Sequence, residues 1–121
     1  TLNALLIVCI YVDFSFVTTQ VDFLPDQFTT LTFYLDPNQV KGELKLMRGK
    51  LNESFIPMGM HSAKTVNAIL KDKGIPAFQR LDWPVLYVED QPIGIPGVSL
   101  NRAFTPNPSL PSYLKVTFVA C

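Results

Sequence analysis

Six basic side chains in the middle of the sequence are the residues best suited to do chemistry, and that chemistry is the binding of an anion. Residues 41–80 hold eight bases against three acids, a net charge of +5, whereas residues 1–40 hold four acids and no Lys or Arg. The overall net charge of zero conceals this polarity, which predicts an anionic partner for the middle of the chain. Phosphate groups are bound by cations spaced along a surface. The candidates are Arg48, Lys50, Lys64, Lys71, Lys73 and Arg80. The alternative is an ordinary solvated surface.

No catalytic constellation accompanies these cations. The six glycines are all separated from one another, so the sequence contains no Gly-rich loop that could bind nucleotide phosphates. His61 is the only histidine, and a single histidine beside a helix start is more typical of a surface residue than of a general base. Glu89 and Asp90 are neighbours in a predicted turn, where carboxylates are usually solvated. We therefore assign no catalytic residue, metal ligand or cofactor to this chain. A further alternative, a small free-standing hydrolase, would require that the isolated chain turns over a substrate.

One helix, predicted over residues 62–73, is expected to position the central cations. Ser62 is the expected N-cap, because its hydroxyl can accept a hydrogen bond from an early backbone N–H. Gly74 stands where a left-handed C-terminal cap is needed. The buried face is predicted from three apolar residues at helical spacing, namely Val66, Ile69 and Leu70. The solvent face is predicted to carry Lys64, Asn67 and Lys71.

Most of the remaining chain is predicted to form short strands, which makes the fold class α+β. Apolar and β-branched residues fill the runs, and most of the ten prolines fall between them, which is typical of short strands and tight turns. The length of 121 residues and the 48% hydrophobic content suit one domain with a core. The predicted strands are 5–16, 29–35, 41–48, a hairpin of 84–88 with 92–95, 98–104 and 114–120.

Three features near the ends of the chain bear on the cellular compartment of the protein and on whether the sequence is a fragment. Cys9 and Cys121 are too few and too far apart for a disulfide framework, so two reduced thiols in a cytosolic protein are expected, one of them buried. The apolar run 4–12 ends at Asp13, well short of the roughly 20 residues that a spanning helix needs, so no membrane partner is expected. The first residue is Thr1, and we expect a fragment of a longer protein.

Several short segments occur in a characteristic order between residues 46 and 104. They are Phe-Ile-Pro-Met-Gly-Met at 55–60, Lys64, Leu-Lys-Asp-Lys-Gly-Ile-Pro at 70–76, Arg80, Pro-Val-Leu at 84–86 and Ile-Pro-Gly at 95–97. In order and spacing this region resembles the C-terminal domain of bacterial tRNA(Ile)-lysidine synthetase. Two details depart from the family pattern: a single Lys64 follows Ala63 where two lysines are common, and Asn-Glu-Ser at 52–54 replaces a turn with Gly and Asp.

The resemblance implies a three-layer β/β/α fold in which β-sandwich-like sheets of mixed short strands accompany one main helix. It also implies a relation to a module in the β chain of phenylalanyl-tRNA synthetase, and a role in holding tRNA on the acceptor-stem side. Lys64 would match the basic position that opens the helix, and Arg80 the arginine that follows it. Residues 1–40 lie outside the resemblance and are expected to supply strands of the same domain, so that 1–121 forms one unit.

The family's reaction is expected to lie outside this chain. In the family, an N-terminal domain with a Ser-Gly-Gly-type loop binds ATP, with Mg²⁺, and joins lysine to the wobble cytidine of tRNA(Ile). This sequence has no Gly-Gly pair, so we expect a fragment that lacks the catalytic domain of this cytoplasmic ligase. The alternative function is a protein-interaction module, in which the N-terminal strands pair in a homodimer or dock on the catalytic domain.

Overall fold

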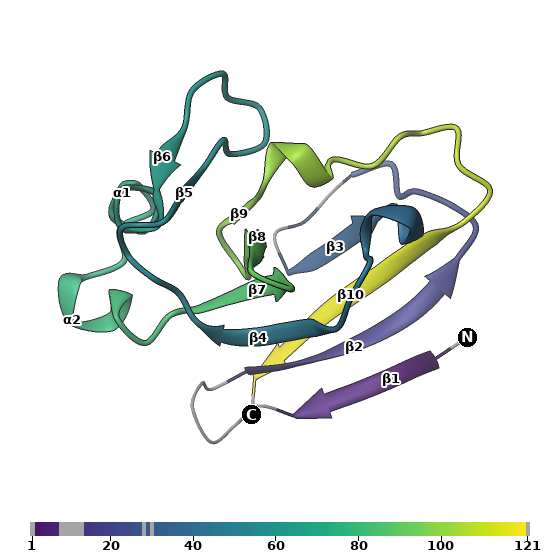
Figure 1. Cartoon of the computed structure of the whole chain (residues 1–121), viewed down its shortest axis with the longest axis horizontal. Helices are drawn as coiled ribbons and strands as arrows, with labels where there is room; N and C mark the ends of the chain where they lie inside the picture. Colours follow the sequence, from purple (N-terminus) through teal and green to yellow (C-terminus); the bar gives the residue numbers. More distant parts are fainter. Residues whose placement is uncertain (1, 8–13, 28, 30, 121) are drawn as a thin grey trace.

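The computed structural model describes residues 2–7, 14–27, 29 and 31–120, and it shows two antiparallel sheets with short helices on one side (Figure 1). Sheet A has the strand order β1 (Leu2–Ile7), β2 (Phe14–Val21), β10 (Tyr113–Ala120) and β3 (Thr32–Leu35). Sheet B has the order β4 (Leu44–Arg48), β7 (Pro84–Val88), β8 (Gln91–Ile95) and β9 (Ser99–Leu100). The predicted α+β class is confirmed.

Smaller elements complete the chain. A two-stranded ribbon pairs β5 (Ser54–Phe55) with β6 (Lys64–Thr65), and α1 (Val66–Asp72) follows it directly. The one-turn helix α2 (Ala77–Arg80) comes next, and 3-10 turns occupy Pro37–Gln39 and Arg102–Phe104. All the strand pairings found in the described residues are antiparallel.

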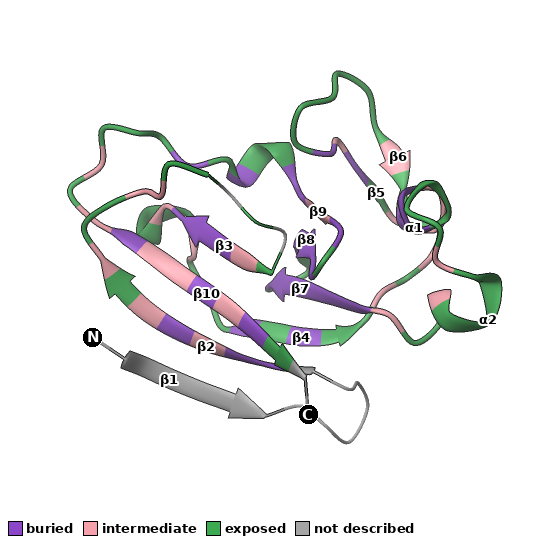
Figure 2. Cartoon of the chain, turned by 180° about the vertical axis from the view of Figure 1, so that it is seen from behind, coloured by how far each residue is buried: buried purple, intermediate pink, exposed green. Residues whose placement is uncertain are grey.

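Sheet B is the middle layer, because apolar side chains cover both of its faces. Leu86 and Val88 of β7 join a cluster with residues of sheet A, whereas Val85 and Tyr87 join a second cluster with α1. Alternate residues of a strand point to opposite faces, so a strand covered on both sides must be apolar throughout. All five residues of β7 are buried, as Figure 2 shows. The order of layers is therefore sheet A, sheet B and α1.

The structure corrects the bounds of several predicted strands. The single strand expected over 5–16 is replaced by β1 and β2, which pair with each other. The strand expected over 98–104 ends early because Asn101 caps a 3-10 turn. Its Oδ1 accepts a hydrogen bond from the Ala103 N–H at 3.0 Å, and its Nδ2 donates to the Pro92 carbonyl at 2.8 Å. The hairpin of β7 and β8 is confirmed to within one residue. Both cysteines, Cys9 and Cys121, lie outside the described residues.

The predicted start of α1 is wrong by three residues. Thr65, not Ser62, is the N-cap, and its hydroxyl accepts a hydrogen bond from the Ala68 N–H at 3.1 Å. The helix cannot begin earlier because residues 64 and 65 are extended and pair with β5. The C-terminal end agrees with the prediction: Gly74 has φ +80°, and the Ile75 N–H donates to the Leu70 carbonyl at 3.0 Å.

Candidate nucleic-acid interface

The structure places the six predicted cations on α1 and its C-cap, on β6 and α2, at the end of β4 and in the turn that follows β4. Lys71 lies in the last turn of α1 and Lys73 is its C-cap residue. Lys64 belongs to β6 and not to the helix, so its predicted place on the solvent face of α1 is wrong. Arg80 ends α2 and Arg48 ends β4, while Lys50 lies in the turn that follows β4. The apolar face of α1 is buried as predicted.

Two of the cations form ion pairs that the sequence did not reveal. Lys64 Nζ pairs with the carboxylate of Asp72 at the other end of α1. Arg48 Nε lies 3.3 Å from Asp82 Oδ1. In both pairs the side chains are partly open to solvent, with exposed fractions of 32% and 55% in the first and 56% and 65% in the second. Exposed pairs of this kind contribute roughly 0–1 kcal/mol, so an RNA phosphate can compete for the cation.

The Arg80 side chain is held by more hydrogen bonds within the protein than the lysine side chains are. Its Nε donates to the Ile75 carbonyl at 2.8 Å, and its Nη1 donates to Asn67 Oδ1 at 3.3 Å. These bonds fasten α2 to α1, and they use Asn67, which was expected to face solvent. Arg80 therefore positions the helices.

Three lysines of the predicted set are exposed, and none of them has a carboxylate partner among the residues that the structure describes. They are Lys50, Lys71 and Lys73. Because no ion pair has to be broken, these side chains can approach phosphates at little cost. They are the strongest part of the predicted set.

A half-buried acid, Glu53, lies at the start of α1 and is held by a tyrosine. The Tyr87 hydroxyl donates a hydrogen bond to Glu53 Oε1 at 2.7 Å. Burial raises the pKa of Tyr87 well above its ordinary value, and the Glu53 carboxylate raises it further. Glu53 also fixes the helix start, because its carbonyl accepts the Val66 N–H at 2.8 Å. Residue types alone could not reveal this contact between positions 34 residues apart.

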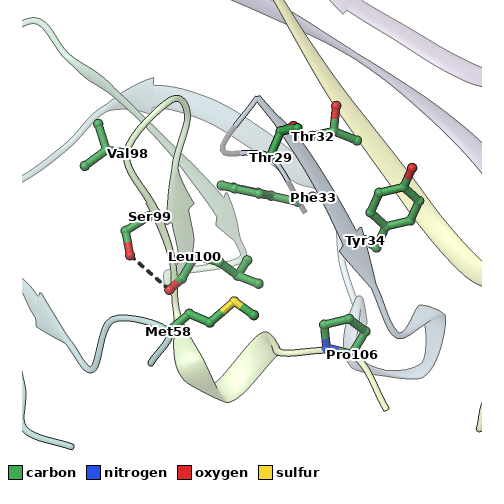
Figure 3. A pocket seen from close by; sticks show the side chains of 9 residues that line it. All are labelled: Thr29, Thr32, Phe33, Tyr34, Met58, Val98, Ser99, Leu100 and Pro106. Carbon is green, nitrogen blue, oxygen red and sulfur yellow. Dashed lines mark hydrogen bonds between the residues drawn. The ribbon is translucent and has the colours of Figure 1, made fainter. Parts of the chain in front are cut away.

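Two pockets lie where the loop before β6 meets β9. The first, which we call the apolar pocket, has a volume of about 230 Å³ (Figure 3). In Figure 3 the Phe33 ring lies across its centre, with Met58 and Pro106 on one side and Thr29 and Thr32 on the other. Its remaining walls are Tyr34, Val98, Ser99 and Leu100.

The second pocket, which we call the cationic pocket, has a volume of about 210 Å³. It brings together two of the six predicted cations, Lys64 and Lys73, and Asp72, which pairs with Lys64. The other walls are Pro57, Met58, Met60, Ile69, Val98 and Ser99. The two pockets therefore share the walls formed by Met58, Val98 and Ser99. Besides these two cations, the Met-Gly-Met segment pointed to this region, through the family resemblance.

Other candidate groups take no part in these pockets. His61 is exposed in the loop before β6. Within the described residues there is no group of three or more His, Cys, Asp or Glu side chains that could hold a metal ion. A search of the same residues finds no helix long and apolar enough to cross a membrane.

Comparison with known proteins decides the family. The model of the TilS substrate C-terminal domain matches residues 44–113, which is more than half of the chain. The chain belongs to this family. The match begins at β4 and ends where β10 begins, so it includes sheet B, α1 and the whole cationic pocket. Of the apolar pocket it leaves out only the walls that β3 and the segment before it supply.

Known relatives of this TilS C-terminal domain agree with the assignment. The chain is 31% identical over 94 residues to a tRNA(Ile)-lysidine synthase from Symbiobacterium thermophilum. The matched region covers 78% of this chain but only 19% of that enzyme, so the chain spans about a fifth of its relative's length.

Solved structures show the same fold. A crystal structure of a TilS C-terminal domain matches with a TM-score of 0.80 at 20% identity, covering 97% of this chain and 90% of that one. An N-terminal fragment of the phenylalanyl-tRNA synthetase β-subunit from Pyrococcus horikoshii matches with a TM-score of 0.58 at 16% identity, covering 71% of this chain and 27% of that one. The first match extends over sheet A as well, which the family model does not reach.

Proposed function

We propose that this chain is the tRNA-binding C-terminal domain of a tRNA(Ile)-lysidine synthetase. The whole protein would be a cytoplasmic, ATP-dependent ligase that joins lysine to the wobble cytidine of tRNA(Ile) with the CAU anticodon. ATP, Mg²⁺ and lysine would bind in a separate N-terminal catalytic domain. Membership of the TilS C-terminal family and the named relative support this assignment.

The observation that carries the tRNA-binding role is the group of exposed lysines on the α1 side of sheet B. Lys50, Lys71 and Lys73 have no carboxylate partner in the described part of the chain, and Arg48 and Lys64 have partners that solvent already reaches. Side chains cannot read the deep major groove of A-form RNA, so such a surface would contact the backbone and recognise shape. This agrees with a domain that holds a tRNA, on its acceptor-stem side, while another domain performs the reaction.

The salt dependence of tRNA binding tests this role. If about four cations contact phosphates, log K should fall with log[salt] at a slope of roughly −3 to −4. The paired variant Lys71→Ala/Lys73→Ala should reduce the steepness of that slope by about 1–2. A matched control is Lys41→Ala/Lys115→Ala, which removes two cations outside the predicted set. A salt-independent affinity, or equal effects of both variants, would contradict the proposed interface.

A second candidate function is a protein-interaction module. Phe78 and Leu81 on and beside α2 are 76% and 64% exposed, the two highest values among the large apolar side chains described. In addition, β1 is an edge strand of sheet A and pairs only with β2. Sedimentation without RNA separates the two functions. A dimer that survives Lys64→Glu but dissociates with Phe78→Ser/Leu81→Ser would favour the interaction module.

A further inference from the structure

The two pockets together form a site whose two ends differ in chemistry. The cationic pocket contains Lys64 and Lys73, whereas the apolar pocket is closed by Phe33, Leu100 and other buried side chains. Their combined volume falls within the range of roughly 300–1,000 Å³ that is typical of small-molecule sites. A ligand that fills both pockets must carry a negative charge at one end and a weakly polar body at the other.

The boundary between the pockets can adjust. Met58 lines both, and its side chain is 40% exposed, so it is not locked in a core. Methionine has three rotatable bonds and a polarizable sulfur, which suits contact with a flat ring. Hydroxyl groups of Thr29, Thr32 and Ser99 are available to the polar edge of such a ring. Ser99 Oγ currently donates only a long hydrogen bond of 3.3 Å, to the Leu100 carbonyl.

We infer that these pockets bind one unpaired nucleotide of an RNA. The phosphate lies between Lys64 and Lys73, and the base passes Met58 into the apolar pocket over Phe33. Unpaired bases at RNA ends and loops can leave the stack and insert between side chains, whereas paired bases cannot. This inference rests on the proposed function and adds a single-stranded subsite to it.

In the free domain, the Asp72 carboxylate then occupies the position beside Lys64 that the RNA phosphate takes in the complex. This ion pair keeps the cation at the pocket. When RNA binds, the phosphate replaces the carboxylate, and Asp72, which is 55% exposed, turns to solvent. Asp72→Asn should therefore tighten the binding of RNA that has an unpaired nucleotide. The matched control is Asp82→Asn, which removes the charge that pairs with Arg48 at a position that does not line either pocket.

Two short RNA hairpins test the inference, one with a single-stranded 3′ overhang and one with a blunt end. The wild-type domain should bind the overhang hairpin about tenfold more tightly, because inserting a base between side chains adds an interaction comparable to stacking. Lys73→Ala should remove most of that difference. Lys71→Ala, its neighbour on the helix, should weaken both hairpins equally because Lys71 lines neither pocket.

Methyl-labelled methionine gives a direct readout that does not depend on affinity. The chain has three methionines, of which Met58 and Met60 line the pockets and Met47 lies on β4. The overhang hairpin should shift the Met58 and Met60 methyl resonances and leave Met47 unchanged. The same spectra show whether each variant is folded.

Three results would overturn the inference in different ways. Equal, salt-sensitive binding of both hairpins would refute the subsite and leave the proposed tRNA-binding function intact. No salt-sensitive binding of either hairpin would refute the proposed function as well. Methionine shifts produced by an acidic peptide but not by the overhang would assign the pockets to a protein partner.

Discussion

The two faces of β7, the strand buried throughout in sheet B, differ in what they can do. On the side of sheet A, Leu86 and Val88 meet only apolar residues in the described core. On the side of α1, Val85 and Tyr87 pack on the helix, and Tyr87 also holds Glu53 through a hydrogen bond. The first face mainly provides stability, and only Phe33 and Leu100 of its cluster also line the apolar pocket. The second combines stability with the placement of charged groups, because a short helix and two loops expose their polar atoms along its margin.

This difference predicts on which face of the sheet substitutions reduce stability least. A layer between two sheets has fixed walls, since each strand is tied to its neighbours by backbone hydrogen bonds. A helix of seven residues can shift when its packing changes. We therefore expect substitutions on the sheet A side to affect stability most, and those on the α1 side to affect stability less and RNA binding more.

Truncation of one leucine on each face gives the largest expected effects. Leu86 and Leu70 are both fully buried. Leu86→Ala should lower the free energy of unfolding by about 3–5 kcal/mol and Leu70→Ala by about 2–3 kcal/mol, because the cost depends on how far the cavity can collapse. Urea unfolding of both variants measures the difference. A larger loss for Leu70→Ala would reverse the comparison.

An added methyl group on β8 should have the next largest effect. A Cβ at Gly94 would lie 2.7 Å from Phe33 Cε2 and 2.8 Å from the Ser99 carbonyl oxygen. One obstacle is a buried ring and the other is backbone, so Gly94→Ala should cost about 1–3 kcal/mol by overpacking. Thermal unfolding provides the measurement, and Gly74→Ala is the contrasting variant, whose strain comes from φ +80° with no atom within 4 Å. Unchanged stability of Gly94→Ala would show that the two sheets can separate locally.

The hydroxyl of Tyr87 should contribute about 1 kcal/mol and a dependence on pH. Its pKa is raised from 10.0 in the folded state, so the folded protein holds the phenolic proton more tightly than the unfolded chain. This contribution to stability is complete below about pH 10 and is lost as the pH rises further. Comparing Tyr87→Phe with wild type by urea unfolding from pH 7 to 11 isolates it. Parallel curves for the two proteins above pH 10 would argue against the Glu53 contact.

Removal of the helix cap should have the smallest effect of the four. Thr65→Ala should cost about 1 kcal/mol, because the Ala68 N–H loses its side-chain acceptor. Ser62→Ala is the matched control and should be nearly neutral, since Ser62 is exposed in the loop and does not cap the helix. Denaturant midpoints of the two variants would distinguish the caps, and the opposite order would restore the cap predicted from the sequence.

Local patterns predicted the elements that depend on local chemistry. The β7–β8 hairpin was predicted because apolar runs flank a polar turn, and the C-terminal end of α1 because Gly74 can adopt a positive φ. The start of α1 could not be predicted in the same way. Ser62 and Thr65 are both suitable caps, and the choice depends on pairing with β5, more than eight residues earlier.

The candidate site was predictable in its residue types but not in its contacts. The positive charge of residues 41–80 lies around α1 and at the end of β4, and its role in binding stays a prediction. However, the pairing of Lys64 with Asp72 spans eight residues, a spacing that does not bring side chains together on one helix. The pair exists because Lys64 lies in a strand beside the helix. The apolar pocket likewise needs β3 and β9, which are far apart in the sequence.

The position of β10 has a consequence for how the protein is made. This strand comes last among the described elements, yet it lies inside sheet A and pairs with both β2 and β3 (Figure 1). During synthesis on the ribosome, β3 must therefore wait without a neighbour in its sheet until residues 113–120 have emerged. A nascent chain that stops before Tyr113 would leave the β3 backbone unpaired and would lack the contact of the Phe33 ring with Phe118, and such a chain would be a natural client for chaperones.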